Sequence, residues 1–93
     1  MPNQAEGPQL TIEEAMRTFP PLYVIYRRPR DLGHEIVMRV WFGMRPYTAF
    51  GFDEIPGGRP ALDRARNVAK NMGAVTCLVR HPTDDPCIVE SWL

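Results

Sequence analysis

Arginine is the side chain best suited to do chemistry in this 93-residue sequence, because ten of its eleven basic residues are arginines. Three of them lie in one segment, YRRPRDLGHE, at residues 26–35. The guanidinium group forms planar, paired hydrogen bonds with carboxylates and phosphates, and it stacks on aromatic rings. The segment therefore holds three candidate binding residues, for a protein or for a nucleic acid: Arg27, Arg28 and Arg30.

The same segment has the composition of a hairpin turn. Pro29 fixes its own φ, Asp31 hydrogen-bonds to nearby backbone, and Gly33 tolerates the left-handed conformation that tight turns use. We therefore predict a solvent-exposed turn in which these three residues serve the structure. Its arginines would at most steer a partner.

A thiol or metal site is the other chemistry that the residue types suggest. Cys77, His81 and Cys87, joined by His34, could supply ligands, but the spacing C-x3-H-x5-C matches no structural zinc pattern. Both cysteines occupy positions where a strand favours a small apolar residue, so we expect reduced, buried thiols. We expect no cofactor, no metal and no catalytic residue, and hence a protein that is not an enzyme.

Composition limits the function classes further. The eleven acidic residues balance the eleven basic ones, which argues against an obligate nucleic-acid binder. The length fits one small domain, and no apolar run approaches the ~20 residues of a membrane span. Residues 1–9 are polar and predict a flexible tail, while residues 10–93 predict a single domain. With no basic, apolar start to the sequence, we expect a cytoplasmic protein without membrane partners.

The elements that must position these residues follow from local patterns. Thr11 and Glu14 form a capping box, which predicts a short helix that ends at Pro20. Alternating apolar and polar residues predict strands at 22–26, 35–42, 47–52, 74–81 and 87–93, and residues 60–72 have the periodicity of an amphipathic helix. The expected fold class is α+β: an antiparallel sheet of four to five strands, built from two hairpins. The amphipathic helix would cover one face of it.

Strand alternation then assigns the two faces of the sheet. Even positions from Ile36 to Phe42 are all apolar and should face the helix, as should Cys77 and Cys87 with their alternating neighbours. The opposite face should carry residues typical of protein interfaces: Trp41, Trp92, Arg39, Arg80 and Glu90. The alternative is that the N-terminal helix or the segment 43–59 folds over this face and buries both tryptophans.

The segment PLYVIYRRPRDLGHEIVMRVWF resembles the opening of small uncharacterised proteins of phage and prophage gene sets, which carry a V-Y-x-x-P-x-D hairpin followed by V-x-R-x-W. Here Arg28 stands where that pattern favours histidine. The resemblance implies a small accessory protein that blocks or modulates a host complex. It transfers no catalytic residue.

We therefore expect a non-catalytic protein-binding domain, acting on another protein or dimerising through its tryptophan face. Two alternatives stay open. A nucleic-acid-binding module would use the arginine-rich turn and the helix, and its affinity would fall steeply with salt. An enzyme subunit would need a thiol or metal site in a pocket.

Overall fold

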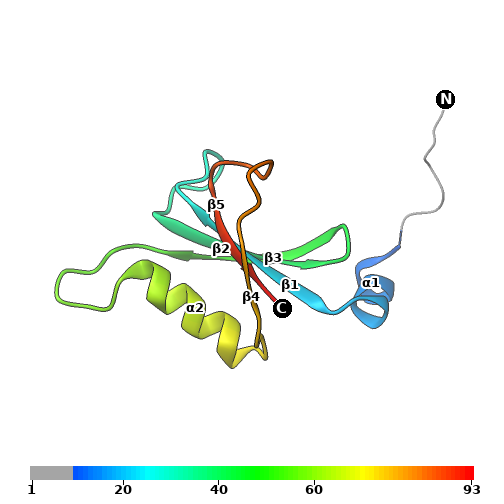
Figure 1. Ribbon diagram of the computed structural model, residues 1–93. Coiled ribbons are helices and arrows are strands. Elements are labelled where there is room, and N and C mark those ends of the chain that lie inside the picture. Colours follow the sequence, from blue (N-terminus) through cyan, green and yellow to red (C-terminus); the bar gives the residue numbers. More distant parts are fainter. Residues whose placement is uncertain (1–9) are drawn as a thin grey trace.

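The computed structural model describes residues 10–93, so the predicted tail at residues 1–9 lies outside the described part. Its centre is one antiparallel sheet with strand order β3-β2-β1-β5-β4. The strands are β1 (Pro21–Arg27), β2 (Ile36–Phe42), β3 (Arg45–Phe52), β4 (Cys77–Val79) and β5 (Ile88–Trp92). Two helices, α1 (Ile12–Thr18) and α2 (Ala61–Asn71), complete the described part of the chain (Figure 1). The predicted α+β class and strand number are confirmed.

The capping box predicted at the start of α1 is present. The Thr11 hydroxyl accepts a hydrogen bond from the backbone of Glu14, and the Glu14 carboxylate accepts one from the backbone of Thr11. The helix docks on the turn between β2 and β3, where a Cβ on Gly43 would lie 2.6 Å from the ring of Phe19. Gly43 has φ +61°, so this turn requires glycine both for its backbone and for the approach of the ring.

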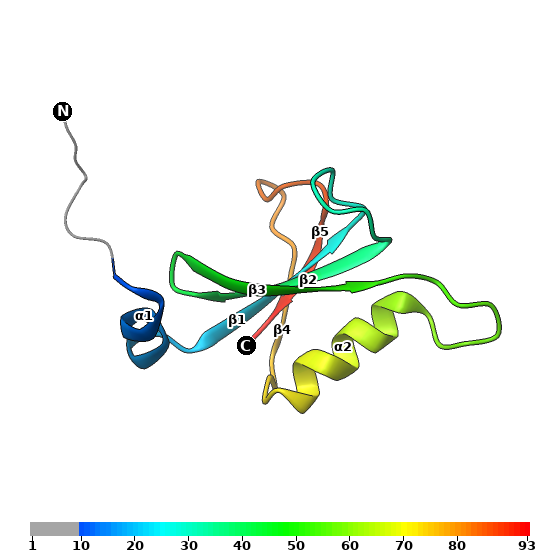
Figure 2. The same ribbon diagram turned by 180° about the vertical axis from the view of Figure 1, so that it is seen from behind.

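Helix α2 packs against the sheet through alanines. Ala61, Ala65 and Ala69 recur every fourth residue and are completely buried. They share one hydrophobic cluster with Ile25 of β1 and Met38 of β2. Because alanine side chains are short, the backbone of α2 approaches the sheet closely. Figure 2 shows α2 lying along one side of the sheet and α1 at the opposite end of the sheet.

The two predicted hairpins differ in the length over which their strands pair. Strands β1 and β2 pair over their whole length, from Pro21 opposite Phe42 to Arg27 opposite Ile36. Strand β4, expected over residues 74–81, has only three residues, although backbone hydrogen bonds continue its pairing to Thr76. Among residues 10–93, no helix is long and apolar enough to cross a membrane.

The turn between β1 and β2 follows the prediction only in part. It is largely exposed, but Pro29 is buried, so this residue packs as well as turning the chain. The left-handed residue is Arg28, with φ +49°, and Gly33 does not have a positive φ. Our assignment of left-handed freedom to Gly33 is therefore wrong. Glycine at residue 33 marks the loop without supplying its unusual conformation.

The close approach of α2 generates a prediction. Replacing Ala65 by leucine should destabilise the protein by about 1–3 kcal/mol, because the larger side chain overfills a fully packed contact. The matched control is Asn71→Leu, which adds the same side chain to an exposed position of the same helix. Urea denaturation followed by circular dichroism measures both. Equal stability of the two variants would show that α2 does not depend on its alanines.

Candidate functional site: the sheet face opposite the helices

The register of the strands defines which residues share a face. Tyr23 of β1 lies opposite Val40 on one side and opposite Trp92 on the other. Directly paired residues of antiparallel strands project to the same face. Since Val40 and Tyr23 belong to the hydrophobic cluster under α2, Trp92 lies on the helix-covered face as well.

The prediction that Trp92 and Glu90 lie on the open face is therefore wrong. Trp92 is 8% exposed and Glu90 is 7% exposed. The Glu90 carboxylate accepts two hydrogen bonds from Arg66 of α2, at 2.8 Å from Nε and 2.9 Å from Nη2. It accepts a third, at 2.6 Å, from the Trp92 indole Nε1. These contacts, led by the hydrogen bonds from Arg66, lower the pKa of Glu90.

The error has a physical cause. Strand alternation places residues 90 and 92 on the same face of the sheet. Because a charged residue is expected to face solvent, this alternation assigns both Glu90 and Trp92 to the solvent-exposed face. Burial of a carboxylate is tolerated when an arginine supplies paired, charge-assisted hydrogen bonds, as Arg66 does here. The partner lies 24 residues earlier in the sequence, where no local pattern points to it.

The face opposite the helices nevertheless carries part of the predicted surface. Strand pairing brings together Leu22 with Trp41, Val24 with Arg39, and Tyr26 with Val37. We call this set the open face: Leu22, Val24, Tyr26, Val37, Arg39 and Trp41. Val24 and Val37 are buried, yet neither belongs to the cluster under α2. A second, thin apolar layer therefore lies beneath the larger side chains of the open face.

Helix α1 does not cover this layer, so the alternative in which it buries Trp41 from above is wrong. The buried residue of α1 is Ala15, and it belongs to the cluster on the α2 side of the sheet, together with Phe42. The segment 43–59 contains β3, which extends the sheet at its edge. Trp41 and Arg39 remain half-buried rather than enclosed.

The polar groups of the open face are held in place by one another. The guanidinium of Arg39 lies 5.5 Å from the centre of the Tyr26 ring and forms an ion pair with Asp31. Burial raises the pKa of the Tyr26 phenol, while the charge of Arg39 and a hydrogen bond involving Trp41 oppose that rise. Arg39 and Trp41 lie two residues apart on β2 and Tyr26 lies beside Arg39, so the three share one face; we call them the Tyr26–Arg39–Trp41 row.

A hollow of about 630 Å³ continues the row toward one end of the sheet. Two loops form its walls, residues 28–35 between β1 and β2 and residues 80–87 between β4 and β5. Both views show these loops side by side at the same end (Figures 1 and 2). Its polar lining mixes both charges: Arg30, Arg39, Asp31 and Asp85.

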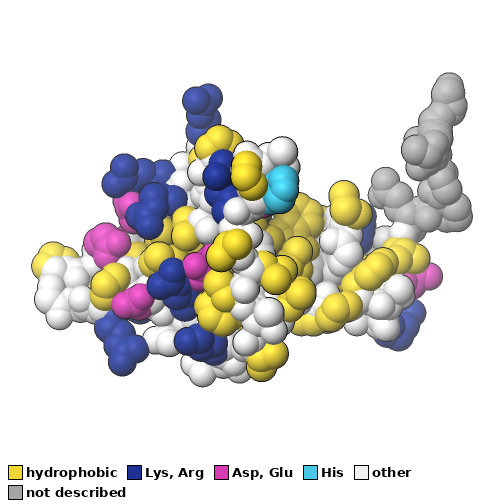
Figure 3. All heavy atoms as spheres, in the orientation of Figure 1, with side chains coloured by type: hydrophobic (Ala, Val, Ile, Leu, Met, Phe, Trp, Pro, Cys, Tyr) yellow, Lys and Arg dark blue, Asp and Glu magenta, His cyan; other side chains and the backbone are white. Residues whose placement is uncertain are grey.

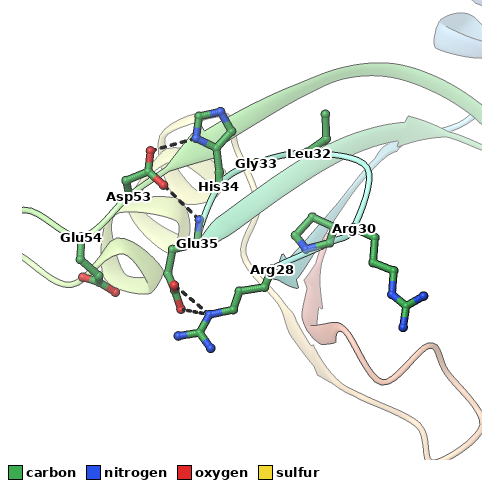
Figure 4. A pocket seen from close by; sticks show the side chains of 9 residues that line it. Arg28, Arg30, Leu32, Gly33, His34, Glu35, Asp53 and Glu54 are labelled. Carbon is green, nitrogen blue, oxygen red and sulfur yellow. Dashed lines mark hydrogen bonds and ion pairs between the residues drawn. The ribbon is translucent and has the colours of Figure 1, made fainter.

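The remaining predicted arginines are engaged mainly in loop structure. Arg27 and Arg28 both pair with Glu35, at 3.5 Å and 2.9 Å. Figure 4 shows the pair between Arg28 and Glu35. Arg80 donates to the backbone oxygens of Asp84 and Asp85. Arg30 has no ion-pair partner among residues 10–93, and Figure 4 shows it pointing away from Glu35 and Asp53. Of the turn arginines, Arg30 alone lines the hollow beside the open face.

A second hollow contains a histidine beside a carboxylate. His34 Nδ1 lies 2.9 Å from Asp53, whose other oxygen accepts a hydrogen bond from the backbone of Glu35 (Figure 4). These contacts lower the pKa of Asp53. The residues that line this hollow include no serine, cysteine, threonine or lysine. No nucleophilic side chain of the protein therefore lies beside the pair, and it joins the turn to the end of β3.

The two cysteines do not behave as expected. Both are free thiols, but Cys77 is exposed and Cys87 is half-buried, so the prediction that both are buried is wrong. Local desolvation raises the pKa of both thiols, and acidic neighbours, Glu90 for Cys77 and Asp85 for Cys87, raise it further. Such thiols are protonated and weakly nucleophilic at neutral pH. Among residues 10–93, no three His, Cys, Asp or Glu side chains gather as a metal site would require.

Sequence reasoning missed the β1 residues of the open face, Leu22, Val24 and Tyr26. A usable signal was present, because pairing across the turn at residues 28–35 brings Tyr26 opposite Val37 and Leu22 opposite Trp41.

Comparison with protein-family models, with curated proteins and with solved structures finds no match to this chain.

The buried carboxylate generates a prediction about stability. Glu90→Gln should cost about 2 kcal/mol at pH 7, since it removes charge-assisted hydrogen bonds to Arg66. The folded-state pKa of Glu90 is lowered, so its contribution is fully present above about pH 4.5 and is lost as the pH falls through the folded-state value. The stability difference between wild type and variant should therefore shrink in acid.

Urea denaturation between pH 3 and pH 7 measures this difference. The matched control is Asp63→Asn. The Asp63 carboxylate also pairs with Arg66, at a longer distance of 3.6 Å, but its side chain is half-exposed. Its cost should stay below about 1 kcal/mol. A variant of Glu90 as stable as wild type at pH 7 would show that the ion pair contributes no net stability.

Proposed function

We propose that this protein is a non-catalytic binding domain that docks another protein on its open face. The observation that carries the proposal is the Tyr26–Arg39–Trp41 row, half-buried on a sheet face that neither helix covers. Tyrosine, tryptophan and arginine are the residues most enriched among those that dominate binding energy. The partner would present an apolar centre to Trp41 and polar groups to the mixed charges of the neighbouring hollow.

The row is also preorganised. Arg39 is held by Asp31 on one side and by the Tyr26 ring on the other, so little side-chain entropy remains to be lost on binding. Val24 and Val37 support the row from below as a packed layer. A rigid aromatic and arginine surface of this kind favours specific docking over nonspecific adhesion.

Nucleic-acid binding is supported less well. Such binding depends on neutralising phosphates with free basic side chains. Arg27 and Arg28 are paired with Glu35, Arg39 with Asp31, and Arg66 with Glu90. With a net charge of zero, the chain has no excess of positive charge to attract a polyanion. An enzymatic role has still less support, because the thiols have raised pKa values and the His34–Asp53 pair has no nucleophile.

The resemblance of the first hairpin to phage-type accessory proteins stays a prediction. If it holds, the docked protein is a component of a host complex, and the open face acts by occupying a surface that the complex needs. The cytoplasm is the compartment in which we expect this to occur. The proposal of protein docking does not depend on that origin.

Trp41→Ala tests the proposal. We expect the affinity for the docked protein to fall by a factor of about 30 or more, which corresponds to roughly 2 kcal/mol for a residue at the centre of an interface. The partner is first captured from the source cell with the wild-type protein under nuclease treatment. It is then purified, and its affinity for wild type and variant is measured by calorimetry.

The matched control is Tyr47→Ala. Tyr47 is a half-exposed aromatic residue of β3 that packs edge-on against Phe42, away from the open face. It should leave the affinity unchanged. Equal binding by wild type and Trp41→Ala would overturn the proposal. Binding to single-stranded nucleic acid that depends on Trp41 and falls steeply with salt would favour the alternative instead.

A further inference from the structure

Strand β4 forms one edge of the sheet, and we propose that it pairs with β4 of a second copy of this chain. This edge exposes large apolar side chains to solvent. Val75 is 86% exposed and Val79 is 88% exposed, although the sequence pattern had placed both under the helix. The helix α2 does not extend over them. Figure 3 looks onto this edge and shows hydrophobic side chains along it.

The hydrogen-bonding pattern identifies which backbone groups are available. Thr76 exchanges two hydrogen bonds with Leu93, at 3.0 Å and 2.9 Å. In an antiparallel ladder, bonded pairs alternate with non-bonded pairs, so Leu78 also points its backbone groups toward β5. The N–H and C=O groups of Cys77 and Val79 therefore point outward from the edge.

The other edge of the sheet is protected. Strand β3 carries Pro46, which lacks an N–H donor, and its pairing with β2 is interrupted by a bulge between Val40 and Trp41. Proline, bulges and charged side chains are the devices by which proteins block pairing at exposed edges. Residues 72–79, MGAVTCLV, contain neither a charge nor a proline, so the protection of β4 is limited to its short length of three residues and the irregularity where Val75 and Thr76 both donate to Leu93.

The sequence of this edge is complementary to itself. Aligned antiparallel about Cys77, residues 75–79 place Val75 opposite Val79 of the second copy, and Cys77 opposite Cys77. Cys77 and Val79 project to the same face as α2, because they pair with Trp92 and Glu90 of β5. On the opposite face Leu78 meets Thr76. This register pairs the outward backbone groups of Cys77 in the two copies, and it directs the Val79 N–H toward the Val75 carbonyl; the Val75 N–H itself donates to Leu93.

No like charges meet in this register, because Arg80 of one copy lies opposite Ala74 of the other. A register centred on Leu78 also avoids like charges, but it brings Val75 against His81 and separates the two Cys77 side chains. A second copy therefore satisfies both the backbone and the side chains of the edge. The contact is short, so we expect a weak, concentration-dependent dimer.

Analytical ultracentrifugation over a concentration series, to about 1 mM, tests the inference in the range expected of small contacts. Wild type should shift from monomer toward dimer as its concentration rises. Val79→Lys should weaken this association by at least about tenfold, because a charge on an edge strand opposes pairing. Its thermal stability should not change, since Val79 is exposed in the monomer.

The matched control is Ile55→Lys, which makes the same kind of change at an exposed apolar residue in the loop before α2. It should dimerise like wild type. A second measurement uses Cys87→Ser, which leaves Cys77 as the single thiol of the chain. A short bis-maleimide should join Cys77 to Cys77 in this variant. Adding Val79→Lys to it should abolish the cross-link.

The possible outcomes decide the question. A monomer at every concentration would overturn the inference, as would a dimer that Val79→Lys does not weaken. A dimer lost on Trp41→Ala, but not on Val79→Lys, would overturn it too and would place the contact on the open face. The inference does not rest on the proposed protein docking, since the two depend on different residues.

Discussion

The ion pair between Arg66 of α2 and Glu90 of β5 determines how the remainder of the structure is arranged. Helix α2 otherwise packs through alanines mainly over β2 and β3, and Arg66 extends that contact to the strand on the far side of β1. By holding Glu90 inward, the pair fixes the orientation of β5. Trp92 then lies in the core, two residues along, and donates its indole hydrogen to the same carboxylate.

This orientation leaves the two faces of the sheet unlike each other. The helix-covered face takes one tryptophan, and the open face keeps the other, Trp41, above a thin layer of two valines. A sheet that is solvated on one side is ordinary for antiparallel strands. Here the solvated side carries aromatic rings and an arginine that are already fixed by their neighbours, which is why we infer a docking surface and not merely an exposed one.

Much of the fold could be predicted from local sequence, and the exceptions have physical causes. The capping box at Thr11, the helix at residues 60–72 and the even-numbered core positions of β2 depend on near neighbours, and they are confirmed. The orientation of β5 depends on Arg66, a distant residue that compensates a buried charge. The exposure of Val79 depends on how far α2 reaches, which no alternation pattern encodes.

The open face and the β4 edge are separate surfaces, yet their geometry relates them. Antiparallel pairing of two β4 strands continues the sheet, and its twofold axis runs perpendicular to the sheet plane. The open faces of both copies would therefore lie on the same side, with Leu78 of each at the junction. Two Tyr26–Arg39–Trp41 rows would then face one partner together. A weak dimer could in this way raise the avidity of a modest docking surface without any new contact to the partner.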